Sequence, residues 1–247
     1  MTSLKTVALA LMLASPAVFS AVNSTQNLVN FHKKTINLND PGDRTGSGGD
    51  AILCFDPVTK KLTSARLWDY AEAEINEGIK PVFAITAKST YEKVQDLLSR
   101  VKIQDPMMYE MLSLVYTNED LKHISEYSNS SNNLFTFIND YKDQSVGLKE
   151  IDDANIATYF KNKGVCKIKQ AAVQGSKFTP GRALVKFDPE IVKLLSSDDF
   201  AGLIFHEMII SYANFIGAEL LKDTDAVRDY NIMMSAKIYE NKAVLKS

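Results

Sequence analysis

The sequence predicts an α+β protein with a largely antiparallel sheet backed by helices. Strand-like runs occur in two groups, one around Cys54 and one within residues 164–187, and helical patterns separate them. A third observation is the segment 200–217, which carries His206 and Glu207 and is apolar on most sides when drawn as a helix. A helix of this kind is buried rather than laid on a surface. We therefore expect one central buried His-Glu helix with the sheet and the other helices around it.

The first 20 residues have the features of a secretory signal peptide. Lys5 gives a positive start, the apolar run TVALALMLASPAVF follows, and the small residues Ser20 and Ala21 come next. The run is too short for a stable membrane span. We predict cleavage after Ser20, export to the periplasm or the medium, and no integral membrane segment afterwards.

The rest of the chain is expected to form an arm and one domain. Residues 21–45 are polar, which predicts a flexible N-terminal arm, and residues 46–247 suffice for a single α+β domain. Loss of Lys5 with the signal peptide changes the net charge from −2 to −3. This overall balance gives no electrostatic footprint for nucleic acid or for an anionic membrane, so no nucleic-acid partner is expected.

Cys54 and Cys166 predict a disulfide. Both lie in strand-like runs, and an even pair in an exported protein is more often a disulfide than two thiols. Two buried free thiols are the alternative. A catalytic cysteine is not expected, because neither cysteine has a histidine close to it in the sequence.

Local patterns predict the elements in order. Two hairpins are expected, the first turning at Asp56-Pro57, and residues 108–116 fit either a helix end or a strand. The glycine-rich sequence 46–50 precedes a strand, which is the wrong order for a phosphate-binding loop and predicts a tight turn. The expected strands are 51–55, 62–67, a short one within 134–141, 166–173 and 181–187; the expected helices are 67–78, 89–104, 189–195, 200–217 with a cap at 197–199, and about 223–242.

His206 and Glu207 are the candidate catalytic residues, and His206 is also the candidate metal ligand. Zinc hydrolases place two histidines four residues apart on a helix, with a glutamate after the first as general base. Here Ile210 stands at the fourth position after His206, and no pattern links His32 or His123 to the pair. Zinc is therefore implied as a cofactor only if this pair is a metal site.

Three interpretations of the pair remain open. A buried ionised glutamate needs a cation, a metal, water in a cleft, or a proton. In the structural interpretation Glu207 forms a buried ion pair with Arg228 of the last helix; in the others the pair serves a metal or catalytic site, or a pocket for a small ligand. Since no nucleophile has a recognisable histidine partner, we expect a non-catalytic binding or structural protein. The alternative is a zincin-like metal-dependent hydrolase, or an inactive relative of one.

Several of these motifs together resemble a family of uncharacterised exported bacterial proteins. Its members share a GxGGD turn before a cysteine-bearing strand, a Cys strand with Gln-x-x-x-Gln, and a His-Glu helix followed by a helix with arginine. The matching residues are Gly46, Gly48, Gly49, Asp50, Cys54, Cys166, Gln170, Gln174, His206, Glu207, Arg228 and Asn231. The resemblance covers residues 46–78 and 148–235 and implies no particular activity. The sequence departs from the pattern at Ile210, where the family often has an aromatic residue.

Overall fold

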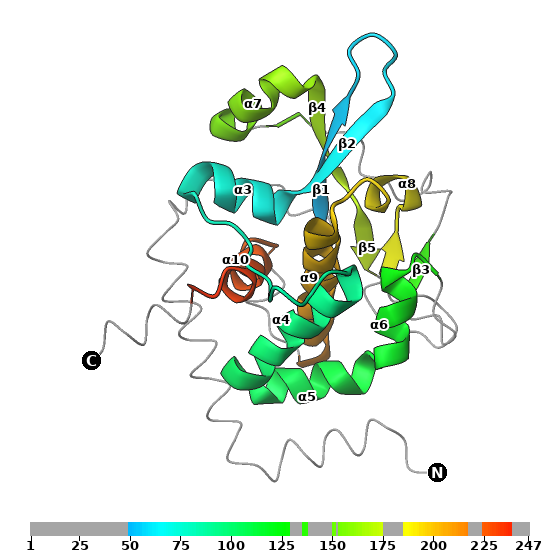
Figure 1. Ribbon diagram of the computed structural model, residues 1–247, viewed down its shortest axis with the longest axis vertical. Coiled ribbons are helices and arrows are strands. Elements are labelled where there is room, and N and C mark those ends of the chain that lie inside the picture. The colour runs from blue at the N-terminus through cyan, green and yellow to red at the C-terminus, as the bar shows by residue number, and fades with distance from the viewer. Residues whose placement is uncertain are drawn as a thin grey trace, which may run out of the picture.

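The strands lie in two small, mostly antiparallel sheets, and helices surround a long central one, so the expected α+β class is confirmed (Figure 1). The signal peptide predicted at 1–20 and the arm at 21–45 lie outside the described residues. A computed structural model describes residues 49–128, 135–137, 150–151, 153–174, 185–216 and 224–238.

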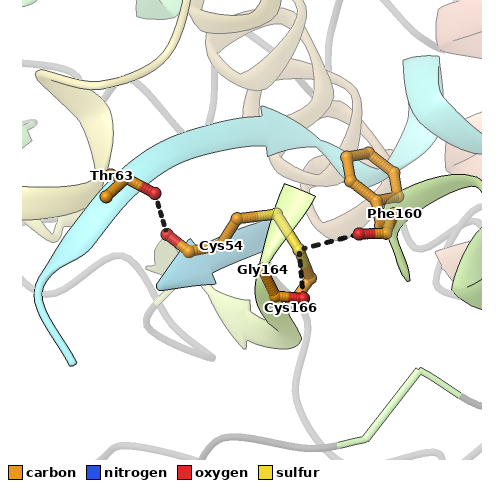
Figure 2. Close-up of a disulfide and its surroundings, with 5 residues drawn as sticks. All are labelled: Cys54, Thr63, Phe160, Gly164 and Cys166. Carbon is orange, nitrogen blue, oxygen red and sulfur yellow. Dashed lines mark hydrogen bonds between the residues drawn. A yellow bond between two sulfur atoms is a disulfide. The ribbon is translucent and has the colours of Figure 1, made fainter. Parts of the chain in front are cut away.

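The first sheet contains both cysteines. Its order is β2-β1-β4, and β1 (Asp50–Phe55) is antiparallel to β2 (Leu62–Leu67) and to β4 (Val165–Gln170). The predicted hairpin between β1 and β2 is confirmed. Cys54 lies directly opposite Cys166 in the ladder, and the predicted disulfide joins them (Figure 2).

The second sheet shows that the single strand expected at 166–173 is wrong. Its order is β3-β6-β5, with β6 (Val185–Phe187) parallel to β3 (Phe135–Phe137) and antiparallel to β5 (Ala172–Gln174). The chain leaves β4 at Ala171, whose N–H donates to the carbonyl of Gly49 at 2.8 Å. One apolar run therefore supplies a strand to each sheet, and the expected second hairpin forms between β5 and β6.

The helices expected at 67–78 and 89–104 form, whereas those at Asn118–Ser125 and Ala154–Phe160 were not expected. Ser89 closes a capping box at the start of α4 (Thr90–Gln104), and Gly78 ends α3 (Trp68–Glu77) with a φ of 71°. The ambiguous segment 108–116 is mostly helical, because Asp105 caps a helix that starts at Pro106. No helix among the described residues is long and apolar enough to cross a membrane. The helices are α3 (Trp68–Glu77), α4 (Thr90–Gln104), α5 (Pro106–Val115), α6 (Asn118–Ser125), α7 (Ala154–Phe160), the 3-10 helix η1 (Lys161–Lys163), α8 (Pro189–Val192), α9 (Ser197–Ile216) and α10 (Thr224–Ser235).

The central helix is α9, which carries His206 and Glu207 (Figure 1). Every residue from 201 to 213 is buried, and α9 contacts α3, α4, α5, α10, β2 and β5. The cap is Ser196, one residue before the expected position: its hydroxyl accepts from the N–H of Asp199 at 3.1 Å and donates to that carboxylate at 2.6 Å. The expected central buried helix is confirmed.

Candidate functional site

His206 is joined to a buried aspartate on another helix. Its Nδ1 lies 2.9 Å from Oδ2 of Asp69, which is in the first turn of α3. Both residues are 1% exposed. The sequence separates them by 137 residues, so this contact exists only because α3 packs against α9.

Asn231 of α10 completes the contact between the three helices. Its side-chain N–H groups donate to Oδ2 of Asp69 at 2.7 Å and to the carbonyl of Gly202 at 3.0 Å. Its amide oxygen accepts from Ser235 at 3.3 Å, and the Ser235 hydroxyl lies 2.7 Å from that of Tyr70. The result is a buried polar network connecting α3, α9 and α10.

The charges of His206 and Asp69 stabilise each other. Burial alone lowers the pKa of His206, but the charge and hydrogen bond of Asp69 outweigh it, so the pKa lies above its ordinary value. Burial raises the pKa of Asp69, and the charge and hydrogen bond of His206 outweigh that effect, so this pKa is lowered. Each shift therefore favours the charged form of its group, the imidazolium of His206 and the carboxylate of Asp69.

Glu207 is held by backbone rather than by a cation. Its Oε1 accepts from the N–H of Gly49 at 2.6 Å, and the residue is 0% exposed. A Cβ on Gly49 would lie 2.2 Å from Cδ1 of Leu203 and 3.3 Å from Oε1 of Glu207, so only glycine fits without movement of the helix side chains. Burial is the main cause that raises the pKa of Glu207 to about 7. A buried glutamate can be compensated by a cation, a metal, water or a proton, and the raised pKa of Glu207 favours the proton.

The predicted ion pair between Glu207 and Arg228 is wrong. Nε of Arg228 lies 3.1 Å from Oε2 of Glu72, and its guanidinium also pairs with Asp225. Arg228 is on α10 and Glu72 is on α3, two helices that pack against each other, so their side chains meet at that contact. Arg228 does join two helices, but they are α3 and α10.

The described residues do not assemble a zinc site. No group of three His, Cys, Asp or Glu side chains in this part of the chain has the spacing to hold a metal ion. His123 lies on α6, where its Nε2 is 3.7 Å from Oε1 of Glu119. His32 lies outside the described residues.

A cavity of about 480 Å³ lies at the start of α9 and does not reach the His-Glu pair. Its polar lining comes mainly from Arg66, Asp198 and Asp199. The carboxylate of Asp199 is already engaged by Ser196 and by the N–H of Leu67 at 3.2 Å. Neither His206 nor Glu207 lines this space, so it does not give them access to a ligand.

Sequence reasoning missed Asp69, the residue that determines the state of His206. One signal was present: Asp69 stands between Trp68 and Tyr70, two large apolar residues at the start of a helix, and such a carboxylate is buried only when it has a partner. The resemblance did point to Gly49 and Asn231, without giving their roles. The bond between Gly49 and Glu207 explains why a glycine precedes the first strand.

Comparison with known proteins adds no assignment: no family model, no curated protein and no solved structure matches this chain.

Glu207→Gln tests the protonation of the buried carboxyl. A raised pKa means that the folded protein holds the Glu207 proton more tightly than the unfolded chain does. The stability gained from this proton is therefore complete below about pH 4.5 and is lost as the pH rises through about 7. The glutamine variant cannot ionise. We expect it to match the wild type near pH 4 and to exceed it by about 3 kcal/mol in free energy of unfolding near pH 8, in urea titrations.

Glu72→Gln is the matched control, because burial also raises the pKa of Glu72 to about 7. Its side chain is 35% exposed, so it should account for a smaller share of the same pH dependence. Parallel stability curves for the wild type and Glu207→Gln would show that Glu207 is ionised in the core.

Proposed function

We propose that this chain is an exported, non-catalytic binding or structural protein in which His206 and Glu207 support the fold. The observation that carries the proposal is that both side chains are used internally at 1% and 0% exposure: Asp69 engages the imidazole, and the N–H of Gly49 engages the carboxylate. A general base must reach a substrate or its attacking water. Closed within the core, this pair instead connects α9 to α3 and to the first strand.

Export is supported by two independent features. The first 20 residues read as a signal peptide, and Cys54 and Cys166 form a disulfide, which persists in oxidising compartments. The disulfide and the buried polar network stabilise the fold. An exported protein of this kind can act by binding, without a catalytic site.

The alternative, a zincin-like hydrolase or an inactive relative, has one observation in its favour. Asp69 contacts Nδ1 of His206, and Nε2 has no hydrogen-bond partner among the described residues. Carboxylates orient zinc-binding histidines in the same manner. Because the described residues lack a set of three metal ligands, an inactive relative fits this arrangement better than an active enzyme.

Metal content decides between these functions. We expect protein purified without chelators to contain far less than one zinc per chain by elemental analysis, and to leave peptide libraries uncut with or without added zinc. The control is Glu207→Gln, which should have the same metal content. One stoichiometric zinc, together with cleavage that Glu207→Gln abolishes, would establish the hydrolase instead.

A further inference from the structure

Four exposed lysines occupy one end of the first sheet; we call Lys60, Lys61, Lys161 and Lys163 the basic tip. Lys60 and Lys61 end the turn of the β1–β2 hairpin, and Lys161 and Lys163 are the outer residues of η1, just before β4. In Figure 1 the hairpin projects from the top of the molecule, with α7 and β4 beside it. The two pairs of lysines come from segments about one hundred residues apart in the sequence.

The backbone brings these segments together. Phe55, at the end of β1, pairs with Val165 at the start of β4. A Cβ on Gly164 would lie 2.4 Å from the carbonyl oxygen of Phe55 and 3.9 Å from Cδ of Pro57, so η1 ends against the base of the hairpin turn. The turn itself is held by Asp56, whose carboxylate accepts from the backbone N–H of Val58 and Thr59.

The basic tip carries an excess of positive charge. None of its lysines forms an ion pair with a carboxylate of the described residues; the nearest carboxylate in sequence is Asp56, whose charge also acts on Lys60. Lys163 lies 4.6 Å from the ring centroid of Tyr159 and 5.0 Å from that of Phe160. The net charge of −2 for the whole chain conceals this local excess.

Exposed apolar side chains stand among the lysines. Val58 at the hairpin turn is 86% exposed, Val165 is 44% exposed and Tyr159 is 42% exposed. An exposed apolar residue in the same turn as two lysines complements a surface that offers both negative headgroups and hydrocarbon. A soluble acidic polymer would satisfy the lysines but not Val58.

We propose that the basic tip docks on a lipid bilayer with anionic headgroups, with Val58 entering the boundary between headgroups and acyl chains. The lysines pair with lipid phosphates, and Tyr159 lies at the same interface. The proposal departs from the expectation based on net charge, because attraction to a membrane depends on charge within a Debye length of it and not on the total.

The surface is separate from the His-Glu pair. Gly49, which contacts Glu207, precedes β1, and the hairpin turn follows it; a six-residue strand separates the two by about 20 Å. The inference therefore does not rest on the proposed role of His206 and Glu207, and its test can fail or succeed independently.

Vesicle binding tests the proposal on the chain from residue 21 onwards. Co-sedimentation should show binding to phosphatidylcholine vesicles with about one third phosphatidylglycerol, weakening as salt rises, and none to pure phosphatidylcholine. Each Lys→Gln change in the basic tip should weaken binding about fivefold, and the four together more than a hundredfold. Val58→Asp should weaken binding by at least tenfold with all four lysines present.

The matched control changes four exposed lysines elsewhere to glutamine: Lys88, Lys102, Lys122 and Lys193. It alters the net charge equally and should keep vesicle affinity within about twofold. Equal loss in both quadruple variants, equal binding to neutral vesicles, or binding to soluble polyglutamate without binding to vesicles would each overturn the proposal.

Discussion

Asp69→Ala is expected to lower the free energy of unfolding by about 3 to 5 kcal/mol, the usual cost of removing one partner of a buried ion pair. The change leaves His206 in the core without its carboxylate and removes an acceptor of Asn231. Burial then dominates the pKa of His206, which should fall below its ordinary value as the ring loses its proton. Urea unfolding measures the first effect, and NMR titration of the histidine measures the second.

Two further variants separate charge from packing. Asp69→Asn keeps the volume and one acceptor, so it should cost less than the alanine variant while still lowering the pKa of His206. His206→Leu combined with Asp69→Ala should cost clearly less than the sum of the single changes, because no charge is left buried. Unchanged or increased stability in Asp69→Ala would instead indicate a functional carboxylate held at a cost to the fold.

Removing both cysteines, as Cys54→Ala with Cys166→Ala, is expected to cost about 4 kcal/mol of stability. The disulfide closes a loop with a sequence separation of 112, and a loop of this length restricts the unfolded chain strongly. The native ladder between β1 and β4 remains, so the variant should fold with the same circular dichroism spectrum at low temperature.

Reductant provides the control for this prediction. Unfolding of the wild type under dithiothreitol should shift toward that of the double variant, whereas the double variant should not respond. If the wild type unfolds at the same urea concentration with and without the disulfide, the bond does not restrict the unfolded chain as the loop length predicts.

The sequence alone determined the features that depend on neighbouring residues. The hairpin turn at Asp56 and the helices at 67–78 and 89–104 each depend on contacts within a few positions, and all three were predicted. The burial of α9 was also predictable, because a helix that is apolar on most sides has no stable place on a surface. The pairing of Cys54 with Cys166 followed from composition, since only two cysteines are present.

Only the tertiary structure decided which polar groups meet in the core. His206 could have paired with any carboxylate, and Asp69 is its partner because α3 crosses α9 at that level. Arg228 meets Glu72 rather than Glu207 for the same reason, and the carboxylate of Glu207 accepts from the N–H of Gly49. Such contacts join residues more than a hundred positions apart, where side-chain periodicity carries no information about the partner. Packing of the apolar faces positions the helices, and the buried polar groups then pair with whatever that packing places within hydrogen-bond reach.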